Sequence, residues 1–258
     1  MDSTRRCALV TGASAGIGAA FARRLARDGY DLVLVARRED RLRALADELE
    51  RAHGTRSLVV AQDLGAPDAP QRVFAATEAA GLFVELLINN AGYGGYGLFD
   101  EQELEKQLGM VDVNCRALVG LSHMYARPMK AKRRGGILHL SSIVAFHPSP
   151  YMATYGATKG FILLFSEALW AELSHHGVAV TALCPGLTQT EFLDVSGLSG
   201  KGHAIETAES VVERGLAGLA ARRPTVICGL FNAARAQIPR FSPRWLTARI
   251  AEFILGHW

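Results

Sequence analysis

The sequence is poor in cysteine and has no closely spaced cysteine pair. Its four cysteines, Cys7, Cys115, Cys184 and Cys228, lie far apart in a chain of 258 residues, and none forms a C-x-x-C motif. Such spacing disfavours a disulfide framework or a zinc site. Because disulfides persist mainly in oxidising compartments, we expect buried, reduced thiols, no bound metal and a cytoplasmic protein.

Long hydrophobic runs and a strong excess of one charge are also absent. No apolar stretch approaches the roughly 20 residues that a membrane-spanning helix needs, and no apolar leader precedes the first strand-like run. Lys and Arg total 28 against 25 Asp and Glu, a net charge of +3. This excess is too small for a nucleic-acid footprint. We expect a small-molecule partner, no nucleic acid and no membrane span.

Short apolar runs alternate with amphipathic stretches along the chain. Nearly continuous apolar runs are typical of parallel strands that are covered on both faces. The alternation predicts one α/β domain over residues 1–258, a Rossmann-type doubly wound fold with a seven-stranded, mostly parallel sheet and helices on both faces. Strands are predicted at 7–11, 31–36, 57–61, 85–89, 136–140, 179–184 and 225–228, and helices at 16–28, 40–51, 69–80, 102–133 (two helices), 155–176 and 208–221.

Two segments fit the alternation less well. Residues 188–206 are rich in Gly and Ser and show little periodicity. Because loops of this length are usually functional, we expect a substrate loop. Residues 229–258 mix apolar side chains with four arginines. We expect a C-terminal helical extension that packs on the domain or on a partner subunit, and a basic helix lying on a membrane surface is the alternative.

A glycine-rich turn, residues 11–18, joins the first strand to the first helix. Glycines here allow a tight turn, close approach of the backbone to a pyrophosphate and close packing of the helix, whose N-terminus attracts anions. The spacing G-x-x-x-G-x-G differs from the G-x-G-x-x-G fingerprint, and three glycines in isolation can also form an ordinary turn. Their position favours binding of a dinucleotide by Gly12, Ser14, Gly16, Ile17 and Gly18.

The end of the second predicted strand bears on the choice of cofactor. An acidic residue here would bind the 2′-hydroxyl of NAD. Instead, the predicted strand 31–36 is followed directly by Arg37 and Arg38. These side chains can hold a 2′-phosphate through charge-assisted, forked hydrogen bonds. Two solvated arginines at a helix start are the alternative, although cations oppose the helix dipole there. The pair therefore predicts NADP(H).

Two further strand ends are candidates for cofactor contacts. Asp63 follows the third strand, where an acceptor can meet the adenine amino group, or it can cap the following turn. The run Asn-Asn-Ala-Gly at 89–92 ends the fourth strand, and its small residues suit a backbone close to the cofactor, although an ordinary Asn-rich turn is an equal alternative in isolation. The predicted contacts are Asp63, Leu64, Asn90, Ala91 and Gly92.

Tyr155 and Lys159 are four residues apart, on one face of a helix start. A free phenol has a pKa of about 10, and a nearby ammonium group can lower it towards the working range. Lys159 can also bind ribose hydroxyls. Alone, the pair is often a half-buried Tyr and a solvated Lys. Ser141 and Ser142 follow the fifth strand at the edge where α/β proteins bind ligands, so a hydroxyl there can orient a carbonyl oxygen.

With these motifs assembled, the chain resembles the short-chain dehydrogenase/reductase family over nearly its whole length. The resemblance selects Ser142 of the two serines, because it lies 13 residues before Tyr155. It implies that Asn114, otherwise interpreted as a helix kink or cap, holds a water that extends a proton relay from Lys159. The matching motifs are 11–18, Asp63, 89–92, Asn114, Ser142, Tyr155, Lys159 and Pro185-Gly186.

The resemblance carries further expectations. It implies that Pro185, Gly186 and Thr188 lie at the nicotinamide, with Thr188 on the carboxamide, and that Arg37 marks an NADP-preferring branch. Helices such as 102–133 and 155–176 form subunit interfaces in the family, which implies a homodimer or homotetramer.

The expected activity is NADP(H)-dependent hydride transfer between nicotinamide and a carbonyl or alcohol carbon. Ser142 and Tyr155 would bind the substrate oxygen, and Asn114, Ser142, Tyr155 and Lys159 would form the catalytic set. An NADPH-binding sensor or scaffold without turnover is the alternative, since a fold alone does not establish catalysis. An apolar substrate is expected from the aromatic candidates for its pocket, which are Tyr93, Tyr96, Phe146, His147 and Phe192.

Overall fold

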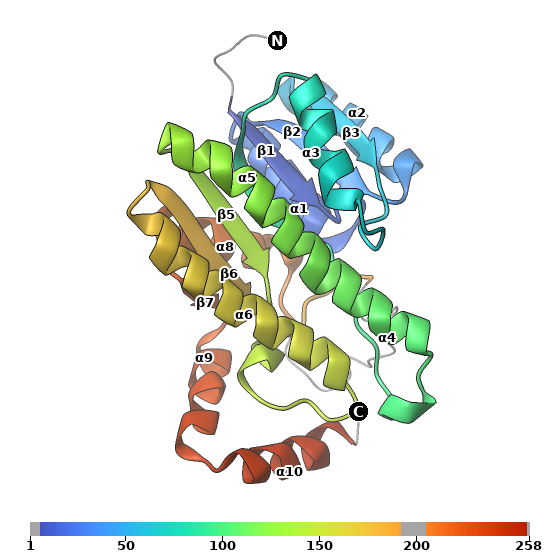
Figure 1. Ribbon diagram of the computed structural model, residues 1–258, viewed down its shortest axis with the longest axis vertical. Helices are drawn as coiled ribbons and strands as arrows, with labels where there is room; N and C mark the ends of the chain where they lie inside the picture. The colour runs from blue at the N-terminus through green and yellow to red at the C-terminus, as the bar shows by residue number, and fades with distance from the viewer. Residues whose placement is uncertain (1–5, 192–204, 257–258) are drawn as a thin grey trace.

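The described part of the chain is built around one parallel sheet. The structure is a computed structural model that describes residues 6–191 and 205–256 (Figure 1). Its strands run parallel in the order β3-β2-β1-β4-β5-β6-β7. The predicted doubly wound α/β fold is confirmed, and the sheet is entirely rather than mostly parallel. The strands are β1 (Cys7–Thr11), β2 (Asp31–Ala36), β3 (Ser57–Ala61), β4 (Val84–Asn89), β5 (Gly135–Leu140), β6 (Val178–Cys184) and β7 (Thr225–Ile227).

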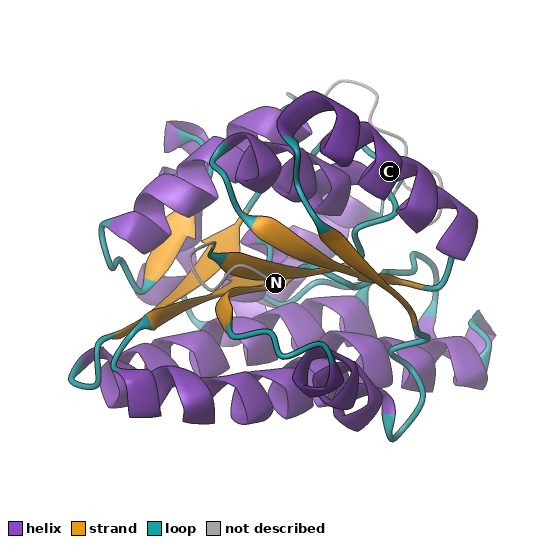
Figure 2. Ribbon diagram, turned by 90° about the horizontal axis from the view of Figure 1, so that it is seen from above, coloured by secondary structure: helices purple, strands orange, loops and turns teal. Residues whose placement is uncertain are grey.

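Helices cover both faces of this sheet and give three layers (Figure 2). Neighbouring residues of β1 point to opposite sides: Ala8 and Val10 enter one core and Leu9 the other. Both faces are therefore apolar, which explains the nearly continuous hydrophobic strands. One face carries α1 (Gly16–Arg27), α2 (Glu39–His53) and α8 (Ala208–Ala220), and the other carries α3 (Ala69–Ala79), α5 (Leu118–Lys132) and α6 (Ala153–Ser174).

The stretch 102–133, predicted to hold two helices, forms α4 (Leu104–Val111) and α5 in one rod (Figure 1). A π-helical turn, η2 (Asp112–Ala117), joins them without a break. Such turns insert an extra residue into the helical path and occur frequently at functional sites. Asn114 falls within this turn and is completely buried, so the widened part of the helix faces the interior.

The C-terminal extension forms α9 (Leu230–Gln237), η4 (Ile238–Phe241) and α10 (Arg244–Leu255), which run across one end of the molecule (Figure 1). The Tyr96 hydroxyl donates to the Leu255 carbonyl oxygen at 2.5 Å and so holds the end of α10. Large side chains such as Phe241 and Phe253 are 87% and 74% exposed. Among the described residues, no helix has the length and apolar character needed to cross a membrane.

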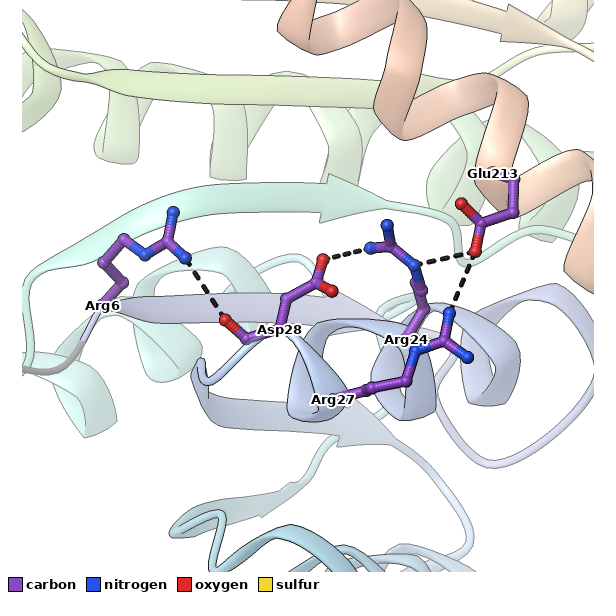
Figure 3. A network of polar contacts seen from close by, with 5 residues as sticks. All are labelled: Arg6, Arg24, Arg27, Asp28 and Glu213. Atoms are coloured by element: carbon purple, nitrogen blue, oxygen red, sulfur yellow. Dashed lines mark hydrogen bonds and ion pairs between the residues drawn. The ribbon is translucent and has the colours of Figure 1, made fainter.

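A network of charged side chains links α1 to α8 near the amino ends of β1 and β2 (Figure 3). Glu213 of α8 forms ion pairs with Arg24 at 2.7 Å and with Arg27 at 3.1 Å. Arg24 also pairs with Asp28, whose backbone carbonyl oxygen accepts a hydrogen bond from Arg6 at 3.3 Å. Each of these cations therefore has an oxygen partner.

The expectation of buried thiols is wrong for one cysteine. Cys7, Cys184 and Cys228 are buried, whereas Cys115 is half-buried in η2. All four are free thiols. Burial raises the pKa of Cys7, Cys184 and Cys228 to about 12, so these groups are inert thiols of the core.

Candidate functional site

A cavity of about 860 Å³ opens where the strands end at the carboxyl edge of the sheet. Its volume lies in the usual range for small-molecule sites. Almost every residue assigned to the cofactor or to catalysis from the sequence lines this cavity, although these residues come from distant segments of the chain. Gly18 and Asn114 are the exceptions, and both lie directly behind residues that do line it.

The glycine turn presents bare backbone to the cavity. Gly12 has a φ of +68°, and a Cβ atom there would lie 2.7 Å from the Asn90 amide nitrogen. A Cβ atom on Gly18 would collide with the Gly12 carbonyl oxygen, so the helix starts directly under the turn. This is the close approach that a pyrophosphate at a helix N-terminus requires. The residues present therefore fit a dinucleotide.

Thr11 fixes the glycine turn against the end of β4. Its hydroxyl oxygen accepts hydrogen bonds from the backbone N–H groups of Asn90 and Ala91, each at 3.0 Å. The Asn90 side-chain amide donates back to the Thr11 carbonyl oxygen at 2.8 Å. Two of the strand ends predicted to contact the cofactor are thus locked together, and Asn90, Ala91 and Gly92 line the cavity beside the turn.

The two arginines after β2 have different surroundings. Arg37 is exposed and lines the cavity, and it has no hydrogen bond or ion pair with any described residue. Arg38 donates to the Ser14 hydroxyl at 3.1 Å and pairs with Glu191 at 3.0 Å. Glu191, which comes from the segment after β6, also pairs with Arg41 at 2.6 Å. A carboxylate therefore does lie at this end of the cavity, although the carboxyl end of the second strand has none.

Asp63 uses one carboxylate oxygen for its own turn. Its Oδ1 accepts a hydrogen bond from the backbone N–H of Gly65 at 2.9 Å, which is the turn-capping alternative. Asp63 and Leu64 both line the cavity beside Arg37. The structure is thus compatible with a cap and a cofactor contact from the same residue.

Ser142, Tyr155 and Lys159 meet on one side of the cavity. The Ser142 hydroxyl forms a hydrogen bond with Tyr155, and the Lys159 ammonium lies 5.6 Å from the centroid of the Tyr155 ring. The neighbouring Ser141 instead donates to the Lys159 backbone carbonyl oxygen at 2.8 Å. The two serines therefore do different things: Ser141 holds α6 against β5, and Ser142 faces the phenol.

The pKa of Tyr155 is shifted in the opposite direction from the one expected from the sequence. Burial raises the pKa of Tyr155 above its ordinary value, and the hydrogen bond with Ser142 lowers it only in part. The net shift is therefore upward and not the decrease expected from the nearby Lys159, because desolvation of the phenolate dominates. Burial also lowers the pKa of Lys159 to about 8, while its ammonium donates to the Leu140 carbonyl oxygen at 2.7 Å.

Asn114 joins the segment after β4 to α6. Its side-chain oxygen accepts from the Tyr93 backbone N–H at 3.1 Å, and its amide nitrogen donates to the Tyr93 carbonyl oxygen and to the Thr158 hydroxyl, each at 3.0 Å. Protein groups thus occupy the amide, which fixes the position of Thr158 and of the adjoining Lys159. A water held by Asn114 stays a prediction.

The segment after β6 closes the cavity on another side. The Pro185 carbonyl oxygen accepts from the Ile143 backbone N–H at 2.9 Å, which ties this segment to the loop that carries Ser142. The Thr188 hydroxyl donates to the Gly186 carbonyl oxygen at 3.2 Å, and a backbone bridge joins Thr188 to Glu206. Pro185, Gly186 and Thr188 line the cavity, and most of the predicted substrate loop, 192–204, lies outside the described residues.

The aromatic candidates for the substrate pocket divide into three groups. Tyr93 and His147 line the cavity, whereas Tyr96 and Phe146 do not. Tyr96 instead contacts Tyr151, with 5.8 Å between ring centroids, and holds α10. Phe192 lies outside the described residues.

Sequence reasoning assigned no part in the site to Thr11, Thr158, Glu191 and Arg235. Thr11 and Thr158 adjoin predicted site residues, so their positions carried a signal. Glu191 and Arg235 line the cavity from segments distant in sequence. No local pattern marks either residue, because each acquires its place only through the path of the chain after β6 and β7.

Comparisons with known proteins identify the family of this chain. The profile of the short chain dehydrogenase family matches residues 6–197. The 7beta-hydroxysteroid dehydrogenase of Collinsella aerofaciens is 36% identical over 192 residues, which cover 74% of this chain and 72% of that protein. The serine 3-dehydrogenase of Agrobacterium fabrum is 37% identical over 186 residues, which cover 71% and 72%.

A solved structure is similar over almost its whole length. It is a short-chain dehydrogenase from Sphingobium yanoikuyae in complex with NADPH, with 35% identity and a TM-score of 0.84, covering 93% of this chain and 94% of that one. The fold and the matched span agree. The chain therefore belongs to the short-chain dehydrogenase family and is an oxidoreductase that acts on CH–OH groups.

Proposed function

We propose that this oxidoreductase uses NADP(H) and transfers a hydride between the nicotinamide and the carbonyl or alcohol carbon of an apolar small molecule. The observation that carries the proposal is the meeting of Ser142, Tyr155 and Lys159 in the same cavity as the bare glycine turn. A proton donor, an oxygen anchor and a dinucleotide cradle then face one enclosed space.

The chain's own residues orient the substrate and move the proton. The cofactor, when bound, supplies the hydride chemistry. Ser142 holds the substrate oxygen, and Tyr155 donates its hydroxyl proton to that oxygen during reduction and takes it back during oxidation. Lys159 binds the ribose, and Asn114 with a water returns the proton.

The preference for NADP(H) is carried by Arg37. Arg37 lines the cavity beside Asp63 and Arg38, and its guanidinium has no described partner, so a 2′-phosphate can accept two hydrogen bonds from it. A similar family member binds NADPH, which supports the same choice. Arg38 contributes only after it exchanges Glu191 for the phosphate, because it is already paired with that carboxylate.

An NADPH sensor or scaffold without turnover is the second candidate. A sensor does not require an intact catalytic set, and here Ser142, Tyr155 and Lys159 are buried together at 8%, 7% and 4% exposure. Burying a lysine is costly for stability, so its retention favours an enzyme over a sensor.

The test is a panel of ketones, aldehydes and alcohols followed through NADPH absorbance, with NADH in parallel. Tyr155→Phe is expected to lower kcat by about 10²- to 10⁴-fold, because it removes the general acid. Tyr151→Phe is the matched control: it removes the same hydroxyl four residues away, outside the cavity. NADPH binding without turnover of any substrate would favour the sensor, and near-normal kcat in Tyr155→Phe would exclude the mechanism.

A homodimer or homotetramer is proposed from the outer faces of α4 and α6. Leu104, Leu108 and Leu164 are 61%, 55% and 68% exposed there, which is unusual for a monomer. Sedimentation of wild type and Leu164→Glu tests this proposal by measuring the oligomeric state of each.

For residues 229–258, co-sedimentation of the full chain and a truncated chain with anionic liposomes separates a membrane contact from a subunit contact. A cytoplasmic location is part of the same proposal.

A further inference from the structure

Arg235 is a cation inside the cavity that the proposed reaction does not use. It lies on α9 and is half-buried, and its side chain has no hydrogen bond or ion pair with any described residue. The other arginine at this end, Arg214, is neutralised by Glu206 at 3.0 Å. Leaving a partly desolvated charge without a partner is unfavourable, so the position of Arg235 is explained best by an anion that arrives with a ligand.

Arg235 lies on the substrate side of the cavity. It is near His147, which follows Ser142 by five residues, and its positive charge contributes to lowering the pKa of His147 below its ordinary value, after burial. The α9 helix packs on η3 (Ile143–Phe146), the turn that directly follows Ser142. The predicted contacts for cofactor phosphates, the glycine turn and Arg37, belong to other elements.

His147 offers a second polar group at the same place. Its Nδ1 donates to the Pro148 carbonyl oxygen at 2.9 Å, which leaves Nε2 as the free position of the ring. Nε2 is buried and has no hydrogen-bond partner among the described residues. Buried polar atoms are almost always paired in native proteins, so this nitrogen is a second indication that a ligand completes the site.

Apolar side chains surround these two polar groups. Leu230 and Phe231, at the start of α9, line the cavity and are 92% and 80% exposed. Ile205, before α8, and Leu255, at the end of α10, line it as well. Exposed aliphatic and aromatic groups at a cavity rim are suited to an apolar body. The complementary ligand is thus apolar along its length and negatively charged at one end.

We propose that Arg235 anchors the carboxylate of substrates whose reacting carbonyl lies at Ser142 and Tyr155, so that the substrates are apolar oxo acids and the corresponding hydroxy acids. The inference rests on the proposed function for the position of the carbonyl. A carboxylate matches the planar fork of a guanidinium with two parallel hydrogen bonds. With Nδ1 donating to Pro148, the unprotonated Nε2 of His147 can accept a hydrogen bond from a donor group elsewhere on the same ligand.

The experiment compares phenyl ketones that end in a carboxylate, over a series of chain lengths, with their methyl esters. Wild type is expected to prefer the best acid over its ester by at least about tenfold in kcat/KM, as for a charge-assisted hydrogen bond. Arg235→Gln should bring this ratio close to one by raising KM for the acid, with the ester unaffected. Arg235→Lys should recover part of the preference.

Arg240→Gln is the matched control. It removes the same charge from the same extension, but Arg240 is exposed, pairs with Gln237 at 3.1 Å and does not line the cavity. It should keep the acid-to-ester ratio. The proposal is overturned if Arg235→Gln weakens acid and ester equally, if Arg240→Gln has the same effect, or if KM for NADPH rises instead.

Calorimetry with unreactive phenylalkanoates and phenylalkanols separates this proposal from the proposed function. If no ketone is reduced, the proposed function fails, yet tighter binding of the acid that is lost in Arg235→Gln still establishes the anchor. Equal binding of acid and alcohol to wild type overturns the anchor whether or not ketones are reduced.

Discussion

The two edges of the sheet treat positive charge in opposite ways. At the amino edge, Arg24 and Arg27 share the carboxylate of Glu213, which is half exposed (Figure 3). At the carboxyl edge, Arg37 and Arg235 have no described partner, and Lys159 is buried with a carbonyl oxygen as its hydrogen-bond acceptor. Both edges are rich in cations, so composition does not distinguish them.

The difference separates charges that serve the fold from charges that serve a ligand. Exposed ion pairs contribute about 0–1 kcal/mol, because solvent screens them. An unpaired or buried cation lowers stability, and it offers its full interaction energy to an anion or a ribose. Changes at the carboxyl edge should therefore alter binding and can even raise stability, whereas changes at the amino edge should alter stability slightly and function not at all.

The largest predicted effect on stability is a gain from Lys159→Met. Burial lowers the pKa of Lys159 from 10.5 to about 8, a difference of about 2.5. At 1.36 kcal/mol for each pKa unit this is a cost of about 3 kcal/mol at neutral pH. Loss of the bond to the Leu140 carbonyl oxygen offsets about 1 kcal/mol. The free energy of unfolding should rise by about 1–3 kcal/mol while kcat collapses.

The dependence on pH identifies the cause of this gain. Between pH 8 and 10.5 the unfolded chain binds more protons at Lys159 than the folded chain, so wild-type stability rises with pH there. The advantage of Lys159→Met in urea unfolding should therefore be largest below pH 8 and should shrink towards pH 10.5. A variant that is less stable than wild type at pH 7 would contradict the assigned cost.

The next effect concerns the cofactor. Arg37→Ala should weaken NADPH binding by about 10- to 100-fold, since a charge-assisted pair contributes about 1.5–3 kcal/mol, and should leave NADH binding unchanged. Fluorescence titration with both cofactors measures this. An equal loss for NADH would mean that Arg37 supports the loop and does not read the 2′-phosphate.

Glu191→Gln should act in the opposite direction. It releases Arg38 from a 3.0 Å ion pair and removes a negative charge from the 2′-phosphate end of the cavity. NADPH binding should tighten by about two- to fivefold, the scale of one exposed ion pair, and 1 M salt should reduce the gain by screening. Weaker NADPH binding would instead show that Glu191 supports the cofactor site.

The smallest effect belongs to the amino edge. Glu213→Gln removes both ion pairs of a carboxylate that is 51% exposed, so the free energy of unfolding should fall by less than about 1 kcal/mol. The kinetic constants should equal those of wild type. Any change in KM for NADPH would show that the two edges are coupled through α1, whose N-terminus carries the glycine turn.

Much of the fold was predictable because its signals are local. Each strand boundary was predicted within one residue, since the buried parallel strands are mostly apolar and most are followed directly by Gly, Pro or a polar residue. The π-helical turn at η2 was not predictable, because the contacts of Asn114 with Tyr93 and Thr158 that accompany it involve residues far apart in the chain. The position of Glu191 at the cavity was not predictable for the same reason, because its partners Arg38 and Arg41 lie about 150 residues before it.

The sequence by itself determined the glycine turn, the spacing of Tyr155 and Lys159, and the presence of arginines instead of an acid directly at the end of β2, because each depends on neighbouring residues. Tertiary structure decided the pKa values of the titratable side chains at the site and which of its arginines are paired. Burial raises the pKa of Tyr155 and lowers the pKa of Lys159, and folding pairs Arg38 while leaving Arg235 without a described partner. Desolvation and ion pairing depend on segments that only the folded chain brings together.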